Sequence, residues 1–420
     1  MPKKAYGWAS DSIPEIAPHS LAKHRILREY VERYIRVLTA MHGMDVFRLS
    51  LVDGFAGGGE YQDRQGILVP GSPQILIDAV RAAEVAVNVG RTKQLRIDAR
   101  HVFVEKDPKV VAYLRALLTR RGDGSNAAIE IIEGAFEAHL ETVIAKIKSR
   151  GRAHRAIFVL DQYGYTGVPL SSLARIFDEL PNAEIFLTLA VGWITAYLPN
   201  SRTAAEKLGI APDTVERLQG LDEEGLDVSD PNRRPDLLAV QRLLHHTFTA
   251  DVGSRFYTPF FIVSRESNRP YWFLHMANSA RAHDVVKSLH WEIENHFQHF
   301  GHAGLAMLGY DPKRDTDVTG QNAFAFDDPA MVRTKTALLE ELPRRIACAG
   351  APVSFGRVFQ SVCNETPATQ AMLADVVNEL CAAGEIEKNG AKGERRADTT
   401  LPHDDDILRV PAQTTLSFGR

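Results

Sequence analysis

Cysteine is scarce in this chain of 420 residues. Its three copies, Cys348, Cys363 and Cys381, lack the spacing of metal ligands. This usage is typical of buried thiols in a reducing compartment and excludes a disulfide framework. Apolar runs of membrane-spanning length are also missing, and no signal peptide is recognised. We therefore expect a cytoplasmic protein without membrane contact.

Charge of one sign is not in excess either, because the formal net charge is −4. The chain as a whole therefore lacks the excess of positive charge that would indicate a nucleic-acid partner. The composition, 45% hydrophobic and 24% charged, is ordinary for a globular protein. A chain of this length is expected to form two or three domains with a large core.

The most informative stretch is LSLVDGFAGGGEYQ, residues 49–62. An apolar run ends in an acid, Asp53, and four glycines follow it closely: Gly54, Gly57, Gly58 and Gly59. This pattern is typical of a parallel strand that feeds a glycine-rich turn. Ligands of open α/β sheets bind at that edge, although such turns also occur for structural reasons alone.

Three more apolar runs end in an acid. Glu105 follows 99–104, Glu133 follows 129–132, and Asp161 follows 156–160. Each gap is long enough for one helix, so the pattern predicts βα units and a parallel sheet.

The charges near the glycine loop indicate the ligand. Glu105, one βα unit after the loop, is well placed to accept hydrogen bonds from both ribose hydroxyls of an adenosine. The acids Glu60 and Asp63 beside the loop favour a cationic ligand over a pyrophosphate. S-adenosylmethionine (SAM) contains an adenosine and carries a sulfonium and an ammonium group, so it fits both the ribose acceptor and the acids beside the loop. Asp53 is the expected partner of the ammonium.

The sequence resembles class I SAM-dependent methyltransferases and, within them, the bacterial three-Cys-motif partner protein family. The resemblance runs from about Trp8 to the His290-Trp291 region. Where the family pattern has prolines, this chain has Gly58 and Gln162. The stretches that carry it are His19-Ser20 with Lys23-His24, residues 52–59 with Tyr61, Gly71-Ser72-Pro73, residues 103–107 and residues 160–164. The resemblance implies an α/β fold, a Rossmann-like sheet of about seven strands with helices on both faces.

The glycine loop and the resemblance together give the candidate cofactor-binding residues. Ser72 is also expected to cap the helix that begins near Pro73, which is its default role. The complete set is Asp53, Gly54, Phe55, Gly57, Gly59, Ser72, Glu105, Lys106, Glu133 and Gly134.

Asp161, Gln162 and Tyr163 are the candidate catalytic residues. In methyltransferases that act on amino groups, polar groups at this position accept hydrogen bonds from the target NH₂, and an aromatic ring stacks on the target. The alternative is a turn with an aspartate cap after a strand.

Helical spacing of apolar residues predicts a long helix within an N-terminal arm, residues 1–45. His19 and Lys23 lie about one turn apart near its start. They form either a cap region with a solvated lysine or, as the resemblance suggests, a lid over the cofactor pocket.

Residues 46–302 are expected to form the methyltransferase-like domain. It includes a fifth strand at 184–192, a polar insertion at about 200–250, and an antiparallel pair at 256–264 and 270–277. A histidine-rich run follows, but its loose spacing favours a helix surface over a metal site. Its members are His283, His290, His296, His299 and His302.

After a linker at 303–330, residues 331–420 have the order helix, short helix, helix and hairpin, which predicts a winged helix. The third helix is expected at 366–383 with Thr366 as its cap. The possible wing carries Lys388, Lys392, Arg395 and Arg396, which could contact phosphates of DNA or RNA. Winged helices also bind proteins, so a protein partner stays open.

The favoured function is therefore a SAM-dependent methyltransferase acting on an amino group of nucleic acid. One alternative is a non-catalytic methyltransferase fold, a scaffold or sensor that recruits a partner through its winged helix. Another is a methyltransferase acting on a protein or a small molecule.

Overall fold

The computed structural model describes residues 7–10, 12–40, 43–162, 168–189, 252–263, 270–293, 297–300, 323–325, 328–397 and 399–411. The chain forms two compact units, Met1–Gln298 and His299–Arg420. The predicted insertion at 200–250 and the candidate catalytic Tyr163 lie outside the described residues, as do His296 and His302.

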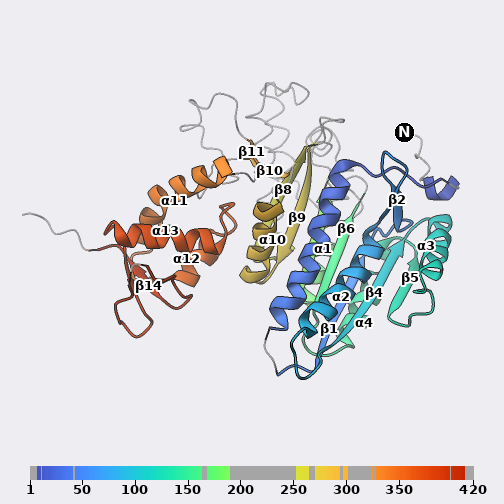
Figure 1. Cartoon of the computed structure of the whole chain (residues 1–420), viewed down its shortest axis with the longest axis horizontal. Helices are drawn as coiled ribbons and strands as arrows, with labels where there is room; N and C mark the ends of the chain where they lie inside the picture. Colours follow the sequence, from blue (N-terminus) through green and yellow to red (C-terminus); the bar gives the residue numbers. More distant parts are fainter. Residues whose placement is uncertain are drawn as a thin grey trace, which may run out of the picture. The chain divides into compact units, whose positions relative to one another are not determined.

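Seven strands of the first unit form a mixed sheet in the order β5-β4-β1-β6-β7-β9-β8 (Figure 1). The first five of these in that order run parallel, and β9 pairs antiparallel with both β7 and β8. The expected α/β fold with about seven strands is thereby confirmed. The bounds are β1 Val46–Asp53, β4 Arg96–Glu105, β5 Ile129–Glu133, β6 Ala156–Asp161, β7 Ala183–Leu189, β8 Phe256–Val263 and β9 Pro270–Ala277.

Two smaller strand features accompany this sheet. A hairpin of β2 (Glu60–Gln62) and β3 (Leu68–Pro70) follows the glycine loop. The strand β10 (Phe297–Phe300) pairs antiparallel with β8 through Phe297 and Gln298.

Helices cover both faces of the sheet, which is why its central strands are apolar along almost their whole length. The apolar residues of β6 and all residues of β7 are buried, for example. Right-handed crossovers place α2 and α3 on one face and α4 and α5 on the other. The helix α1 packs against α2 and against α10. The bounds are η1 Gly7–Ser10, α1 Pro18–Leu38, α2 Ser72–Asn88, α3 Pro108–Arg120, α4 Phe136–Lys148, α5 Leu170–Glu179 and α10 Ala280–Ile293.

The strand order reverses between β1 and β6. From β1 the chain proceeds to β4 and β5 on one side, and it then returns to β6 and β7 on the other side. Such a topological switch point opens a crevice at the carboxyl ends of the two strands. Asp53 ends β1 and Asp161 ends β6, so both acids lie at this crevice.

The second unit has the element order of a winged helix, as predicted. Its three-stranded sheet has the order β12-β14-β13, with β12 between α11 and α12 and the other two strands after α13. The bounds are β11 Ala323–Ala325, α11 Asp328–Cys348, β12 Val353–Ser354, α12 Phe355–Val362, α13 Gln370–Ala382, β13 Glu387–Asn389 and β14 Ile407–Arg409. Among the helices that the structure describes, none combines the length and the apolar character needed to cross a membrane.

The start of α13 corrects the prediction from the sequence. The cap is Thr369, whose hydroxyl accepts a hydrogen bond from the Met372 N–H at 3.2 Å. Thr366 lies one turn earlier, where its hydroxyl accepts from the Ala368 N–H at 3.2 Å. Two threonines near the helix start both offered a capping hydroxyl, and the sequence pattern selected the wrong one.

Candidate functional site

The glycine loop, residues 54–59, connects β1 to the small hairpin strand β2. Gly57 and Gly59 have φ values of +58° and +84°, which favour glycine. The Gly57 N–H donates to Glu105 Oε2 at 3.0 Å, and the Ala56 N–H donates to the Val104 carbonyl at 3.0 Å. The loop is therefore folded onto the end of β4.

Glu105 ends β4 with a half-buried carboxylate. Its Oε2 accepts from Gly57, and its Oε1 accepts from the Asp107 N–H at 2.9 Å. Two backbone donors hold the carboxylate in one orientation at the edge of the crevice. The sequence placed this acid correctly beside the loop, because a strand end and a loop after the adjacent strand must meet in a parallel sheet.

Asp53 is fully buried at the end of β1. Its Oδ1 accepts a hydrogen bond from the Phe55 N–H at 3.1 Å, whereas its Oδ2 is buried without a hydrogen-bond partner among the described residues. Burial raises the pKa of Asp53 to about 7, although the Ser72 hydroxyl and the Phe55 N–H act in the opposite direction. A buried carboxyl with one unsatisfied oxygen suits a cationic or hydrogen-bond-donating ligand.

Ser72 is not the cap of α2, contrary to the expectation. The N-cap is Gly71, and no side chain caps the helix. Ser72 is already the first helical residue, and its hydroxyl interacts with the Asp53 carboxyl group. The Ser72 side chain thus belongs to the crevice.

Asp161 forms an ion pair with Lys23 from α1. The Lys23 ammonium donates to both carboxylate oxygens at 2.7 Å and lies 3.5 Å from the Thr188 hydroxyl. Burial would raise the pKa of Asp161, but the Lys23 ammonium outweighs it, so that pKa lies below its usual value. The carboxylate is therefore ionised and fixed, and its side chain is 37% exposed.

His24 lies beside this pair on α1. Burial, together with the positive charges of Lys23 and Arg28, lowers the pKa of its imidazole to about 4 against the opposing effect of Asp161. His24 is thus neutral at pH 7, and its ring lies 5.9 Å from the ring of Tyr61. The sequence singled out Lys23 and His24 through the resemblance, but it did not predict their contact with Asp161.

Gln162 is buried directly after Asp161. Its side-chain carbonyl accepts a hydrogen bond from the Val168 N–H at 3.0 Å and so closes the loop that follows β6. Gln162, a candidate catalytic residue, therefore also stabilises the local fold through its hydrogen bond with Val168.

The remaining candidates lie along the same edge. Phe55 is half-buried, with its ring 6.4 Å from that of Phe136, and Lys106 is exposed after β4. Glu133 is exposed at the end of the edge strand β5, and Gly134 donates its N–H to the Glu105 carbonyl at 2.9 Å. The backbone thus brings the ends of β4 and β5 together beside the crevice.

The two acids after the glycine loop do not face a ligand, which corrects the electrostatic reasoning from the sequence. Glu60 is buried and accepts hydrogen bonds from the Tyr113 hydroxyl at 2.6 Å and from Arg120 at 2.9 Å. Asp63 accepts from two backbone N–H groups of its own turn. Both carboxylates are used for structure.

Trp8 covers the glycine loop, a role that the sequence did not predict. Its indole N–H donates to the Glu60 carbonyl at 2.7 Å, and its ring is 6% exposed. A Cβ added to Gly58 would lie 2.5 Å from the indole ring. Glycine at this position therefore makes room for Trp8, which gives a physical reason for the departure from the family's proline.

In the second unit, the four basic residues of the wing differ in exposure. Lys388 is buried, and its ammonium donates to Asn378 Oδ1 at 2.6 Å and to the Thr400 carbonyl. Arg396 is paired with Asp406 at 3.2 Å. Lys392 and Arg395 are exposed, and neither forms an ion pair with a described residue. Lys388 is thus a structural residue of the hairpin and is not among the wing residues that are exposed for contact with phosphates.

Comparison with known proteins gives one matching family model and several solved structures of low sequence identity. The model of the GMT-like wHTH domain family matches residues 309–393. No curated protein matches this chain.

Solved structures of similar fold have low sequence identity. The structure of WbdD is 14% identical with a TM-score of 0.31, and the match covers 61% of this chain and 40% of WbdD. An O-methyltransferase from Bacillus cereus in complex with SAH is 11% identical, covering 64% of this chain and 86% of that one, with a TM-score of 0.29. The O-methyltransferase TomG from Streptomyces achromogenes, in complex with SAM, is 13% identical, covering 63% and 92%, with a TM-score of 0.28.

Proposed function

We propose that this chain is a SAM-dependent methyltransferase similar to the three-Cys-motif partner proteins. The observation that carries the proposal is the hydrogen bond between Glu105 Oε2 and the Gly57 N–H. It sets a fixed carboxylate beside a glycine loop at the carboxyl edge of a parallel sheet, next to its switch point. An adenosine with free ribose hydroxyls fits an acceptor in this place.

The residues around the crevice fit the rest of the cofactor. Asp53 Oδ2 is a buried acceptor without a partner among the described residues, and an ammonium group would satisfy it. Lys106, Glu133 and Gly134 at the next strand ends would border the adenine. When bound, the cofactor supplies an electrophilic methyl group, and the chain's own residues orient the acceptor.

We assign the orienting role to Asp161. Lys23 keeps the Asp161 carboxylate ionised and fixed at the switch point, and 37% of its side chain remains exposed. An exposed carboxylate of fixed orientation can accept a hydrogen bond from a target amino group and direct its lone pair toward the methyl group. An amino group of a nucleic-acid base is our favoured target, and a paired base would have to leave the duplex to reach it.

Methyl transfer from tritiated SAM to DNA, RNA and protein fractions tests the proposal. We expect labelling by the wild type and a roughly 10- to 100-fold slower turnover for Asp161→Asn, the range for losing a charge-assisted hydrogen bond. Cofactor affinity is expected to change much less. The control is Glu141→Gln, which removes an acid on α4 whose side chain is 69% exposed. Full activity of Asp161→Asn would contradict the role assigned to Asp161. Labelling of the protein fraction without labelling of DNA or RNA would show that the target is a protein and not a nucleic acid.

A second candidate function is favoured by the charge of α13. In a winged helix the helix before the wing commonly meets the partner, and the exposed positions of α13 include Asp375 and Glu379. Glu379 pairs with Lys335, so the Asp375 carboxylate is the main group on this face that repels phosphates. This face therefore favours a scaffold that recruits a protein through its winged helix. Wild-type protein that binds SAM but labels no fraction would support this candidate over the enzyme.

A further inference from the structure

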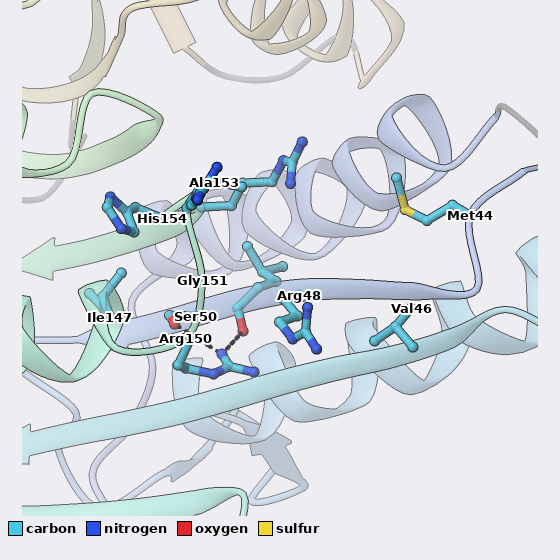
Figure 2. Close-up of a pocket in the computed structure, with 12 residues that line it drawn as sticks. Met44, Val46, Arg48, Ser50, Ile147, Arg150, Gly151, Ala153 and His154 are labelled. Atoms are coloured by element: carbon cyan, nitrogen blue, oxygen red, sulfur yellow. Dashed lines mark hydrogen bonds between the residues drawn. The ribbon is translucent and has the colours of Figure 1, made fainter.

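A basic cavity lies at the amino edge of the sheet, opposite the crevice described above (Figure 2). The start of β1 and the loop between α4 and β6 enclose about 120 Å³. From Ser50, the last β1 residue that lines this cavity, to Asp53 at the crevice, β1 extends roughly 10 Å, at about 3.3 Å for each residue. The two sites are therefore separate.

Arginine dominates the lining of this cavity. Arg48, Arg150, Arg152 and Arg155 contribute four guanidinium groups, and His154 lies among them. The carboxylate that pairs with them is Asp98, which is 3.5 Å from Arg48 and 2.8 Å from Arg150. One carboxylate against four guanidinium groups leaves the cavity with an excess of positive charge.

Arg150 forms a rigid floor for the cavity. Its guanidinium donates to the Leu49 carbonyl at 2.6 Å, to the Ser50 hydroxyl at 3.0 Å and to the Asp98 carbonyl at 2.6 Å. Figure 2 shows this side chain extended beneath the 150–154 loop, with Arg48 on the neighbouring strand. Arg150 thus ties the loop to two strands.

The other guanidinium groups are less engaged. Arg152 is exposed and forms no ion pair or hydrogen bond with a described residue. Arg155 stacks over the Phe47 ring with 5.5 Å between its guanidinium carbon and the ring centroid, and Arg48 is 57% exposed. Stacking leaves the edge of a guanidinium available for a bidentate contact.

The loop that carries these arginines has an uncommon backbone. His154 has φ +44°, and among the described residues no other non-glycine residue has a positive φ. Strained backbone of this kind is concentrated at ligand sites and costs about 1–3 kcal/mol. His154 lies in the loop between Arg152 and Arg155, and both of these arginines line the cavity.

We propose that this cavity binds the phosphate group of a phosphorylated ligand. Guanidinium groups match tetrahedral oxyanions with paired N–H donors, and four arginines line this concave site, with Arg150 held in place by its hydrogen bonds. The inference goes beyond the proposed function and does not depend on it. The ligand is either a free nucleotide or a nucleic-acid strand, which share the phosphate chemistry.

Calorimetric titration of the full chain with pyrophosphate at low salt tests this proposal. We expect saturable binding to the wild type and a loss of about tenfold or more in affinity for the Arg48→Gln/Arg152→Gln double variant. Arg115→Gln, an exposed arginine on α3, is the matched control and should bind as the wild type does. Unchanged thermal melting of the double variant would show that the fold is intact.

Two further titrations distinguish the sources of the phosphate. ATP that binds as tightly as pyrophosphate, or more tightly, supports a free nucleotide. A single-stranded oligonucleotide whose affinity rises with length and depends on Arg152 supports a nucleic-acid strand. Absence of pyrophosphate binding to the wild type, or equal binding by wild type and double variant, would overturn the proposal.

Discussion

At the scale of the residue, the strand-ending acids could be predicted and their partners could not. Asp53, Glu105, Glu133 and Asp161 each close a strand, as the apolar runs before them indicated. The ion pair of Asp161 with Lys23 joins residues 138 positions apart. No local pattern encodes such a contact, because it depends on how α1 packs across the sheet edge.

The roles of Glu60 and Ser72 were wrong for a related reason. Each lies beside a motif that suggested a local role, a ligand charge for Glu60 and a helix cap for Ser72. In the folded chain, residues distant in sequence determine the contacts of both side chains. Glu60 accepts a hydrogen bond from Arg120 on α3, and Ser72 interacts with Asp53 on β1.

Asp53 gives a prediction about stability and pH. Its folded-state pKa of about 7 lies above its ordinary value of 3.8, so the folded protein holds this proton more tightly than the unfolded chain. The resulting stability is fully present below pH 4 and is lost as the pH rises to about 7, by roughly 4 kcal/mol. Asp53→Asn removes this dependence.

Urea unfolding of cofactor-free protein at several pH values checks this prediction. Relative to Asp53→Asn, the wild type is expected to lose stability between pH 4 and pH 7.5. Comparison of the two proteins cancels the contribution of His24, which both retain. A constant difference across this range would show that Asp53 is ionised normally in the folded state.

At the scale of the element, the seven-stranded sheet followed from apolar runs, gaps and the antiparallel pair at the end. The strand order was not predicted, because apolar runs and gaps do not indicate which strands are neighbours. Helix starts were less predictable, since Thr366 and Thr369 offer similar caps and only the packed structure selects one. The contact of η1 with the glycine loop had no signal in the sequence.

Trp8 and Gly58 give a prediction at this scale. A Cβ on residue 58 would overlap the indole ring at 2.5 Å, so Gly58→Ala should destabilise the protein by about 1–3 kcal/mol. In a Trp8→Gly background the same substitution should cost far less, because the space is empty. Thermal unfolding of the four proteins measures this coupling, and additive effects would contradict the packing explanation.

At the scale of the whole molecule, the two units carry different functional signals. The first has strand-ending acids at its switch point, and the second has a wing with exposed Lys392 and Arg395. Composition could not reveal this division, because the charges nearly cancel over the chain. The partner of the second unit must therefore be read from its own surface.

Salt dependence tests whether the wing contacts nucleic acid. If Lys392 and Arg395 bind phosphates, a Lys392→Ala/Arg395→Ala variant should bind DNA or RNA more weakly and with a slope of log affinity against log salt shallower by about 2. The buried Lys388 is unsuitable for this test, because its substitution would disturb the hairpin. An unchanged slope would favour a protein partner.

The central claim is that the crevice beside Glu105 binds SAM, and calorimetry with SAM and its demethylated product tests it most directly. We expect saturable binding to the full-length wild type and a loss of about 1.5–3 kcal/mol of binding free energy for Glu105→Gln, the range for a charge-assisted hydrogen bond. Glu130→Gln, a partly exposed acid on β5, is the control. No binding of either compound at millimolar concentration to intact wild-type protein would contradict the claim.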